Sequence, residues 1–346
     1  MYCDVKKKYN KETTEMKRTI VIVATLMVCA FGYGQDKELM NGYQTRLQAL
    51  FDRVQNAPTD NERYLANEEA VQVLGEALAE EGSENWKWNF TKYVSVLRSP
   101  DKVFTIITWP VVRDNGEYEC FGFVQSKGKD EDDEEELKVY ELHDHSEEII
   151  NREEMTLDAD NWLGAVYQEI IQTSYEGKTF YTLLGWNGCS MLTQRKVIEP
   201  IQINARNGKP QFGQALFKKE KNKRRVILEY NKEAMVYLGY EQQLSVSKEN
   251  VRVKKDGRMV MSQVSHEQKE QMIIFDEIEP QVEGMEGLYQ YYVPSGKEMA
   301  YVFVNGKWEL RPDAQGRLTD KKLNKEFKPI EKKKPAYQTI NTDNNN

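Results

Sequence analysis

The chain has 346 residues, which is long enough for one large domain or two ordinary ones with an apolar core. Hydrophobic residues make up 39% and charged residues 30%, so the chain is more polar than an average globular protein. Nineteen Tyr, twelve Phe and six Trp nevertheless exclude a disordered chain. The formal net charge of −8 disfavours nucleic acid and anionic lipid as bulk partners.

Residues 16–34 have the layout of a secretory signal peptide. They begin with Lys17 and Arg18, continue with an apolar run of about a dozen residues and end in small residues before Gln35. The run is short for a membrane span, and the alternative is an uncleaved anchor or a buried helix. Residues 1–15 indicate an overcalled translation start or a long basic region. We expect an exported protein of the periplasm or cell surface, with no stable membrane span after leader cleavage.

Two helices are predicted within residues 35–98. From Asp36 to Asn56 apolar residues recur at steps of three and four, which gives one apolar helical face. Thr59 followed by Glu62 is the capping-box pattern that opens a second helix, and Gly82 closes it. A short loop joins the two, so we expect an αα-hairpin that packs on a β-rich domain.

The strongest hairpin signal lies in residues 102–125, where two apolar runs flank the Asp-Asn-Gly of residues 114–116. Side chains on the face of Trp109 and on the face of Phe104 are both largely apolar. This pattern predicts a first strand that is covered on both faces. Pro110 is expected to end its regular hydrogen-bond ladder.

Strand patterns with Asn-Gly and Asp-Gly turns continue through a predicted β-rich domain at 99–310. They predict an antiparallel meander that forms a sandwich or a barrel-like body, with an irregular β-propeller as the alternative. Residues 146–173 look helical or mixed, and residues 294–296 are expected to form a turn. Residues 311–346 are Lys- and Asn-rich and predict a disordered tail.

Several aromatic side chains are candidates for ligand binding. Trp109 and Trp186 fall where strands pass into turns, so a ring there could be half exposed, with core packing as the alternative. A further cluster of aromatic residues at 86–93 is expected to be core or a packing seam between two elements, because each ring has a large area to bury. The alternative is a carbohydrate platform.

The candidate metal ligands are His143 and His145, because residues two apart on a strand point the same way. An acid or His266 could complete such a site, and a polar loop end is the alternative. No cofactor is predicted. Removal of the leader leaves Cys120 and Cys189, which predict either one disulfide or two buried thiols.

The sequence contains no G-x-S-x-G, H-E-x-x-H, Walker A or G-x-G-x-x-G motif. We therefore expect a non-catalytic binding or scaffold protein whose partner is a protein or glycan of the cell envelope, and not a nucleic acid. The alternative is a secreted hydrolase that acts on polysaccharide or peptide through paired carboxylates. Candidate pairs are Asp276 with Glu279 and Glu117 with Glu119.

Several segments carry a family resemblance: DKVFTIITWPVVRDNGEYECFGFVQ, YTLLGWNG, RRVILEYN, MIIFDEIEP and YYVP, after a leader that ends in GYGQ. They resemble uncharacterised exported proteins of Bacteroides-type Gram-negative bacteria, over roughly residues 85–310. The resemblance implies an exported location. It implies no activity, cofactor or catalytic residue.

Overall fold

Helices occupy the first part of the chain and antiparallel strands the rest. The computed structural model describes residues 37–130, 132–188, 190–255 and 258–312. Its helical elements are α1 (residues 37–56), α2 (Asp60–Ala79) and the 3-10 turns η1 (Ser83–Asn85) and η2 (Tyr289–Tyr291). The prediction of a mainly antiparallel β-protein with an N-terminal helical pair is confirmed.

The described strands form three sheets, each built from consecutive strands. The first sheet contains β1 (Ser95–Arg98), β2 (Phe104–Val112), β3 (Tyr118–Lys129) and β4 (Glu135–His143). The second contains β5 (Val166–Tyr175), β6 (Lys178–Asn187), β7 (Thr193–Ile203), β8 (Pro210–Phe212) and β9 (Val226–Asn231). The third contains β10 (Leu238–Lys255), β11 (Arg258–Pro280), β12 (Tyr292–Val304) and β13 (Lys307–Arg311).

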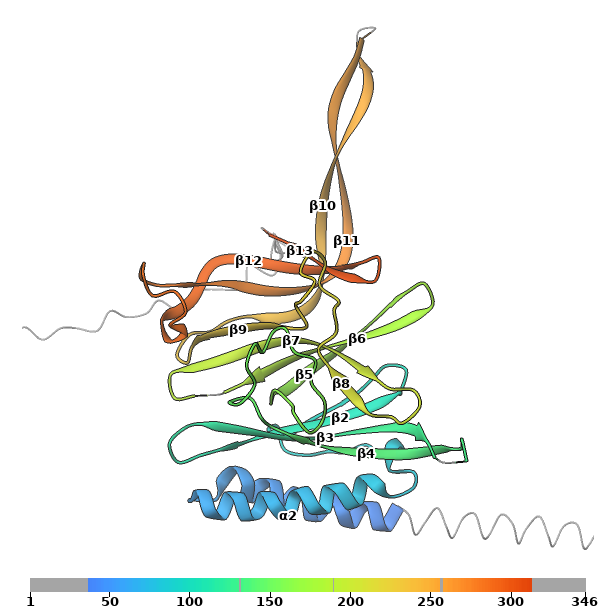
Figure 1. Cartoon of the computed structure of the whole chain (residues 1–346), viewed down its shortest axis with the longest axis vertical. Coiled ribbons are helices and arrows are strands. Elements are labelled where there is room, and N and C mark those ends of the chain that lie inside the picture. Colours follow the sequence, from blue (N-terminus) through green and yellow to red (C-terminus); the bar gives the residue numbers. More distant parts are fainter. Residues whose placement is uncertain (1–36, 131, 189, 256–257, 313–346) are drawn as a thin grey trace, which may run out of the picture.

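The three sheets stack in chain order, with the helices on the outer side of the first (Figure 1). A separate apolar core fills each gap. Phe51, Leu74 and Trp109 lie between the helices and the first sheet. Phe104, Trp162 and Phe212 lie between the first and second sheets, and Ile198, Ile273 and Trp308 between the second and third. The architecture is therefore a layered sandwich rather than a closed barrel.

α2 begins where the capping box predicts. The Thr59 hydroxyl accepts a hydrogen bond from the backbone N–H of Glu62 at 3.3 Å and donates to the Glu62 carboxylate at 3.0 Å. This exchange satisfies one of the N–H groups that a helix start leaves without a partner.

β2 is covered on both faces, as its two apolar faces predict. Ile107 and Trp109 enter the core under the helices, whereas Phe104 and Ile106 enter the core against the second sheet. The expectation that Pro110 ends the ladder is wrong, because Pro110 pairs with Cys120 inside β2. β1 covers the other edge of β2 only as far as Thr108, so the missing N–H of Pro110 costs no hydrogen bond there.

The hairpin predicted at residues 114–116 is confirmed. The backbone N–H of Gly116 donates to the carbonyl of Arg113 at 2.8 Å, and that of Arg113 donates to Glu117 at 2.9 Å. Gly116 has φ of +79°, a left-handed conformation that glycine adopts without a side-chain clash. The turn is therefore the three-residue kind that ends in a left-handed glycine.

Two local predictions in the β-rich domain differ from the structure: the helix among the alternatives for residues 146–173, and the turn at residues 294–296. Residues 146–165 form an irregular lobe and the following residues form β5, with no helix in this stretch. Bridges of Asp144 to Trp162 and of Leu157 to Phe212 pin the lobe between sheets, so its apolar residues enter a β-core. The turn expected at residues 294–296 is instead a bulge inside β12, where residues 295–297 lie opposite Glu277 alone because Pro294 pairs with Ile278 and Glu298 with Asp276.

A fully buried ion pair sits inside the second layer. The Arg225 Nε donates to Glu199 Oε1 at 2.5 Å, and neither side chain is exposed. The other Glu199 oxygen accepts from the Tyr167 hydroxyl, which itself accepts from Trp162 Nε1 at 2.9 Å. Burial, followed by the nearby Glu199 charge, raises the pKa of Tyr167 well above its usual range. The tyrosine is therefore neutral and acts as a hydrogen-bond donor.

No helix in the described part of the chain is long and apolar enough to span a membrane. The predicted leader, the predicted tail beyond residue 312 and Cys189 lie outside the described residues. Cys120 is buried in β3, and its pairing with Cys189 stays a prediction.

We expect Arg225→Met to lower the free energy of unfolding by about 3–5 kcal/mol, because it leaves Glu199 charged and buried without its partner. Adding Glu199→Leu should recover part of that loss. Urea unfolding of both variants measures the difference. Arg206→Met, at an exposed arginine, is the control and should change stability by less than about 0.5 kcal/mol. Equal stability of Arg225→Met and the wild type would contradict the assignment.

Candidate ligand-binding site

An aromatic strip leads the chain from α2 into the first sheet. Trp88 stacks on Phe90 with ring centroids 5.4 Å apart, and Trp86 meets Trp88 edge-on at 6.5 Å. Phe90 in turn packs edge-on against Phe51 of α1 at 5.0 Å. The strip is thus anchored at one end in the helical core, while its two indoles remain half-buried.

Backbone contacts hold this strip on α1. Gln44 Nε2 and Gln48 Nε2 both donate to the carbonyl of Asn89, at 2.5 Å and 2.8 Å. The backbone N–H of Asn89 donates back to Gln44 Oε1 at 3.1 Å. Two glutamines one helical turn apart therefore fix the chain between Trp88 and Phe90.

The two indoles form part of a hollow of about 330 Å³ beside the end of α2. Its lining residues come from η1, the strip, β1, β2 and β3: Ser83, Glu84, Asn85, Trp86, Lys87, Trp88, Val96, Arg98, Thr105 and Gln125. Arg98 pairs with Thr105, and Thr105 pairs with Gln125, so these three are neighbours across three strands. Cross-strand neighbours share a face of the sheet, which here is the helix side.

The floor of the hollow is fixed by the end of α2. Gln125 Nε2 donates to the carbonyl of Leu78 at 2.7 Å and to Ser83 Oγ at 2.9 Å. Ser83 Oγ donates to the same Leu78 carbonyl at 2.9 Å. These bonds satisfy a carbonyl at the helix end that has no partner within the helix. The floor is therefore preformed.

Three of the residues that line the hollow carry polar groups without a partner among the described residues. Trp86 Nε1 is buried and has no hydrogen-bond partner among the described residues. The side chains of Arg98 and Lys87 also make no hydrogen bond or ion pair within the described part of the chain. Two aromatic walls with three donors can hold a ring that carries oxygen substituents.

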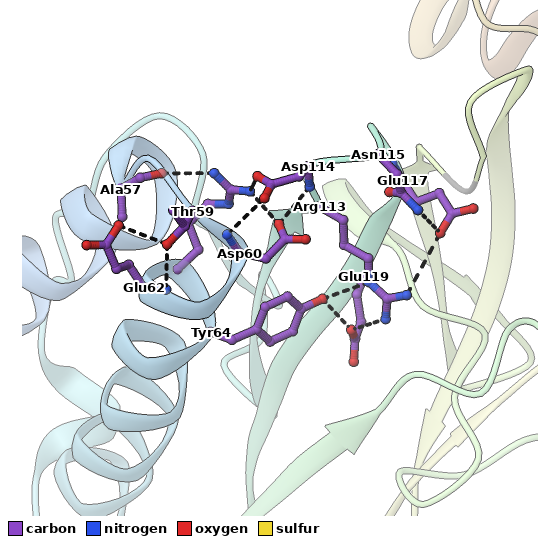
Figure 2. A network of polar contacts seen from close by, with 11 residues as sticks. Ala57, Thr59, Asp60, Glu62, Tyr64, Arg113, Asp114, Asn115, Glu117 and Glu119 are labelled. Atoms are coloured by element: carbon purple, nitrogen blue, oxygen red, sulfur yellow. Dashed lines mark hydrogen bonds and ion pairs between the residues drawn. The ribbon is translucent and has the colours of Figure 1, made fainter.

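The opposite end of α2 carries a clasp of ion pairs between the helices and the β2–β3 hairpin (Figure 2). Arg63 pairs with the carboxylates of Asp60 and Asp114, and donates to the carbonyl of Ala57 at 2.9 Å. The backbone N–H of Asp114 donates to Asp60 Oδ1 at 2.6 Å. This half of the clasp ties the start of α2 to the hairpin turn.

Arg113, Tyr64 and Glu119 form the other half of the clasp (Figure 2). Arg113 donates to the Tyr64 hydroxyl at 3.0 Å and to Glu119 Oε2 at 2.8 Å, and Tyr64 donates to the same oxygen at 2.6 Å. Burial and the Glu119 hydrogen bond raise the pKa of Tyr64 to about 12. Because its charged groups pair with one another, we interpret the clasp as structural, whereas the hollow at Trp86 presents side chains that have no partner among the described residues.

The two tryptophans that were predicted as ligand-binding residues differ in burial. Trp109 is fully buried, and its Nε1 donates to Asn67 Oδ1 at 2.7 Å, so here it is a core residue. Trp186 is half-buried, with Nε1 donating to Gln194 Oε1 at 2.7 Å and its ring edge-on to Tyr118. A ligand-binding role for Trp186 stays a prediction.

His143 and His145 are both partly exposed and lie beside acids. His143 Nδ1 is 4.0 Å from Glu141, and His145 Nδ1 is 3.3 Å from Glu148. Within the described residues no group of three or more His, Cys, Asp or Glu side chains is placed to hold a metal ion. The side chain of His266 lies outside what the structure describes, so the metal site stays a prediction.

Asp144, which lies between these two histidines in the sequence, has a structural role. Asp144 is turned inward, where Oδ2 accepts from the N–H of Cys120 at 3.0 Å and Oδ1 from that of Ser146 at 2.9 Å. Its carboxylate also fills the space beside Gly164, where a Cβ atom would meet it at 2.2 Å. Burial raises the pKa of Asp144 despite these hydrogen bonds.

Neither predicted acid pair lines the hollow at Trp86 or the acidic hollow described below. Glu117 and Glu119 both face Arg113 in the clasp. Asp276 accepts from the N–H of Tyr237 at 2.8 Å, while Glu279 is exposed on β11. Acids do gather elsewhere, in a hollow of about 630 Å³ at the 146–165 lobe. Its acidic lining residues are Glu147, Glu153, Glu154 and Glu229.

Comparisons with known proteins returned no match to a family model, a curated protein or a solved structure. The site is therefore interpreted from its own geometry. The aromatic cluster at 86–93 was visible in the sequence, but Arg98 and Gln125 were not. Only the strand register of β1, β2 and β3 brings them to it.

We expect Asp144→Asn to lower the free energy of unfolding by about 1–3 kcal/mol, because one amide oxygen cannot serve two buried N–H groups. The raised pKa means that the folded state holds the Asp144 proton more tightly than the unfolded chain does. Protonated Asp144 therefore makes its full contribution to the free energy of unfolding of the wild type below pH 3.8, its ordinary pKa. That contribution falls as the pH rises through the pKa of Asp144 in the folded state. The difference between wild type and variant should shrink over that window.

Chemical unfolding at several pH values measures this difference, with the exposed Glu81→Gln as the control. A difference that grows with pH would contradict the assignment.

Proposed function

We propose that this protein is an exported, non-catalytic binding module that holds a glycan in the hollow at Trp86 and Trp88. One observation carries the proposal: two half-buried indoles stand over a fixed floor, beside a buried Trp86 N–H that has no partner among the described residues. Sugar rings offer apolar C–H faces to aromatic walls and hydroxyl groups to donors.

The charge of the hollow narrows the ligand class. Arg98 and Lys87 contribute two cations, and Glu84 contributes one acid whose Oε1 accepts from Asn85 Nδ2 at 3.1 Å. A glycan with acidic substituents fits this balance better than a neutral one. Glycoside hydrolysis needs two carboxyl groups across the bond, and the hollow has one. This supports binding without turnover.

The acidic hollow supports a second candidate function, a hydrolase. Glu153 and Glu229 are both half-buried there. Glu153 Oε1 accepts from the N–H of Ile227 at 3.0 Å, and Glu229 accepts from Arg195 Nε at 2.7 Å. Each carboxylate already supports the fold, which is why we place this function second. Turnover of a polysaccharide or peptide that Glu153→Gln abolishes would favour it over the binding module.

A screen of purified polysaccharides, followed by calorimetry on the best ligand, tests the binding proposal. We expect Trp88→Ala to raise Kd at least about tenfold, because truncating a central aromatic contact removes 1–2 kcal/mol or more. Trp86→Phe keeps an aromatic ring and removes the N–H donor, so it should raise Kd by a smaller factor.

Trp186→Phe is the matched control, since Trp186 is also half-buried but lies outside the hollow. It should leave Kd unchanged. Loss of binding in Trp186→Phe with none in Trp88→Ala would move the site to the second sheet. If no glycan in the screen binds, the proposal that the ligand is a glycan is rejected.

A further inference from the structure

β10 and β11 continue as a two-stranded ribbon far beyond the third sheet. They pair from Leu238 with Phe275 out to Lys255 with Arg258, whereas β12 pairs with β11 only from Met272 onward. At about 3.3 Å per residue the unaccompanied part is on the order of 40 Å long. Figure 1 shows it projecting from the top of the stack, away from the other layers.

The outer ribbon, residues 248–255 and 258–265, is cationic in an acidic chain. Five basic residues and one acidic residue give it a net charge of +4, against −8 for the whole chain. In the strand register Arg252 lies opposite Met261, and Lys254 lies opposite Met259. Arg252 and Met261 are cross-strand neighbours and therefore share one face of the ribbon. Arg252 is exposed, and Met259 and Met261 are 64% and 62% exposed.

The acidic hollow has the complementary chemistry. It places the four glutamates and Arg152 beside Ile150, which is 79% exposed, and Tyr289, which is 42% exposed. Glu147 and Glu154 are exposed, and their side chains pair with no described residue. The hollow thus offers unpaired negative charge next to apolar surface.

We propose that the outer ribbon of one copy docks in the acidic hollow of a second copy. Arg252 would face Glu147 and Glu154, while Met259 and Met261 would cover Ile150 and Tyr289. The ribbon points away from its own body, so the contact joins different copies. The ribbon is also several times longer than the screening distance of about 8 Å at physiological salt. The acidic body of the same copy therefore does not cancel the charge of its own ribbon.

Such a contact is head-to-tail, because the two surfaces are different patches of the same chain. Repetition of a head-to-tail contact gives a ring or an open filament, whereas a two-fold contact stops at a dimer. Since the interaction is largely electrostatic and exposed, salt should weaken it. This inference does not depend on the glycan-binding proposal.

The test is sedimentation velocity of the full chain over a concentration series at low and high salt. We expect species larger than a dimer at low salt. A ribbon variant, Arg252→Glu with Met261→Ser, and a hollow variant, Glu147→Arg with Glu154→Arg, should each raise the self-association constant Kd at least tenfold. Lys178→Glu, at an exposed position on β6, matches the charge change of the ribbon variant, and Glu68→Arg with Glu81→Arg, at exposed positions on and just after α2, matches that of the hollow variant. Both controls should have no effect.

Mixing the two variants gives the sharpest result. The ribbon variant keeps an intact hollow and the hollow variant keeps an intact ribbon, so the mixture should form one-to-one dimers that grow no further. A wild-type chain that stays monomeric at low salt would overturn the proposal. So would self-association that survives either variant, or a mixture that stays monomeric. If the protein is a monomer and its ribbon binds anionic phosphatidylglycerol vesicles, the partner of the ribbon is a lipid surface and not a second copy.

Discussion

The first sheet can hold this molecule together only because β2 and β3 are apolar on both faces. One face lies under the helices through Trp109 and Phe123, and the other lies against the second sheet through Phe104 and Val124. A sheet with a single apolar face would support either the helices or the second sheet, but not both. The layered stack in Figure 1 depends on this double coverage.

Each layer is then fixed by a small number of polar contacts. The clasp around Arg63 and Arg113 sets one end of α2, and Gln125 sets the other. In the second layer the Glu199–Arg225 pair lies where no water is available to replace a lost partner. These contacts specify how the layers sit, while the apolar cores supply most of the stabilisation.

The two surfaces with unused chemistry follow from the same architecture. The hollow at Trp86 forms where the chain leaves α2 and must cross to β1, so its walls belong to a connection and its floor to a rigid sheet. The ribbon forms where β10 and β11 continue beyond the end of β12 in the third sheet. One surface is suited to a small rigid ligand, and the other reaches well beyond the body. A protein with both could bind a glycan while it assembles with copies of itself.

The sequence by itself determined the local elements. The helical pair follows from the period of its apolar residues and the Thr59–Glu62 cap, and the β2–β3 hairpin follows from residues 114–116, because these signals act between residues a few positions apart. Residues 146–173 show where this reasoning fails. Their apolar pattern is compatible with a helix, but the bridges to Trp162 and Phe212 hold the lobe between two sheets. Only the tertiary structure decided that Trp109 is buried and that Arg98, Gln125 and Trp86 surround one hollow. Those outcomes depend on strand register and on which layer covers which face, and neither is encoded by neighbouring residues.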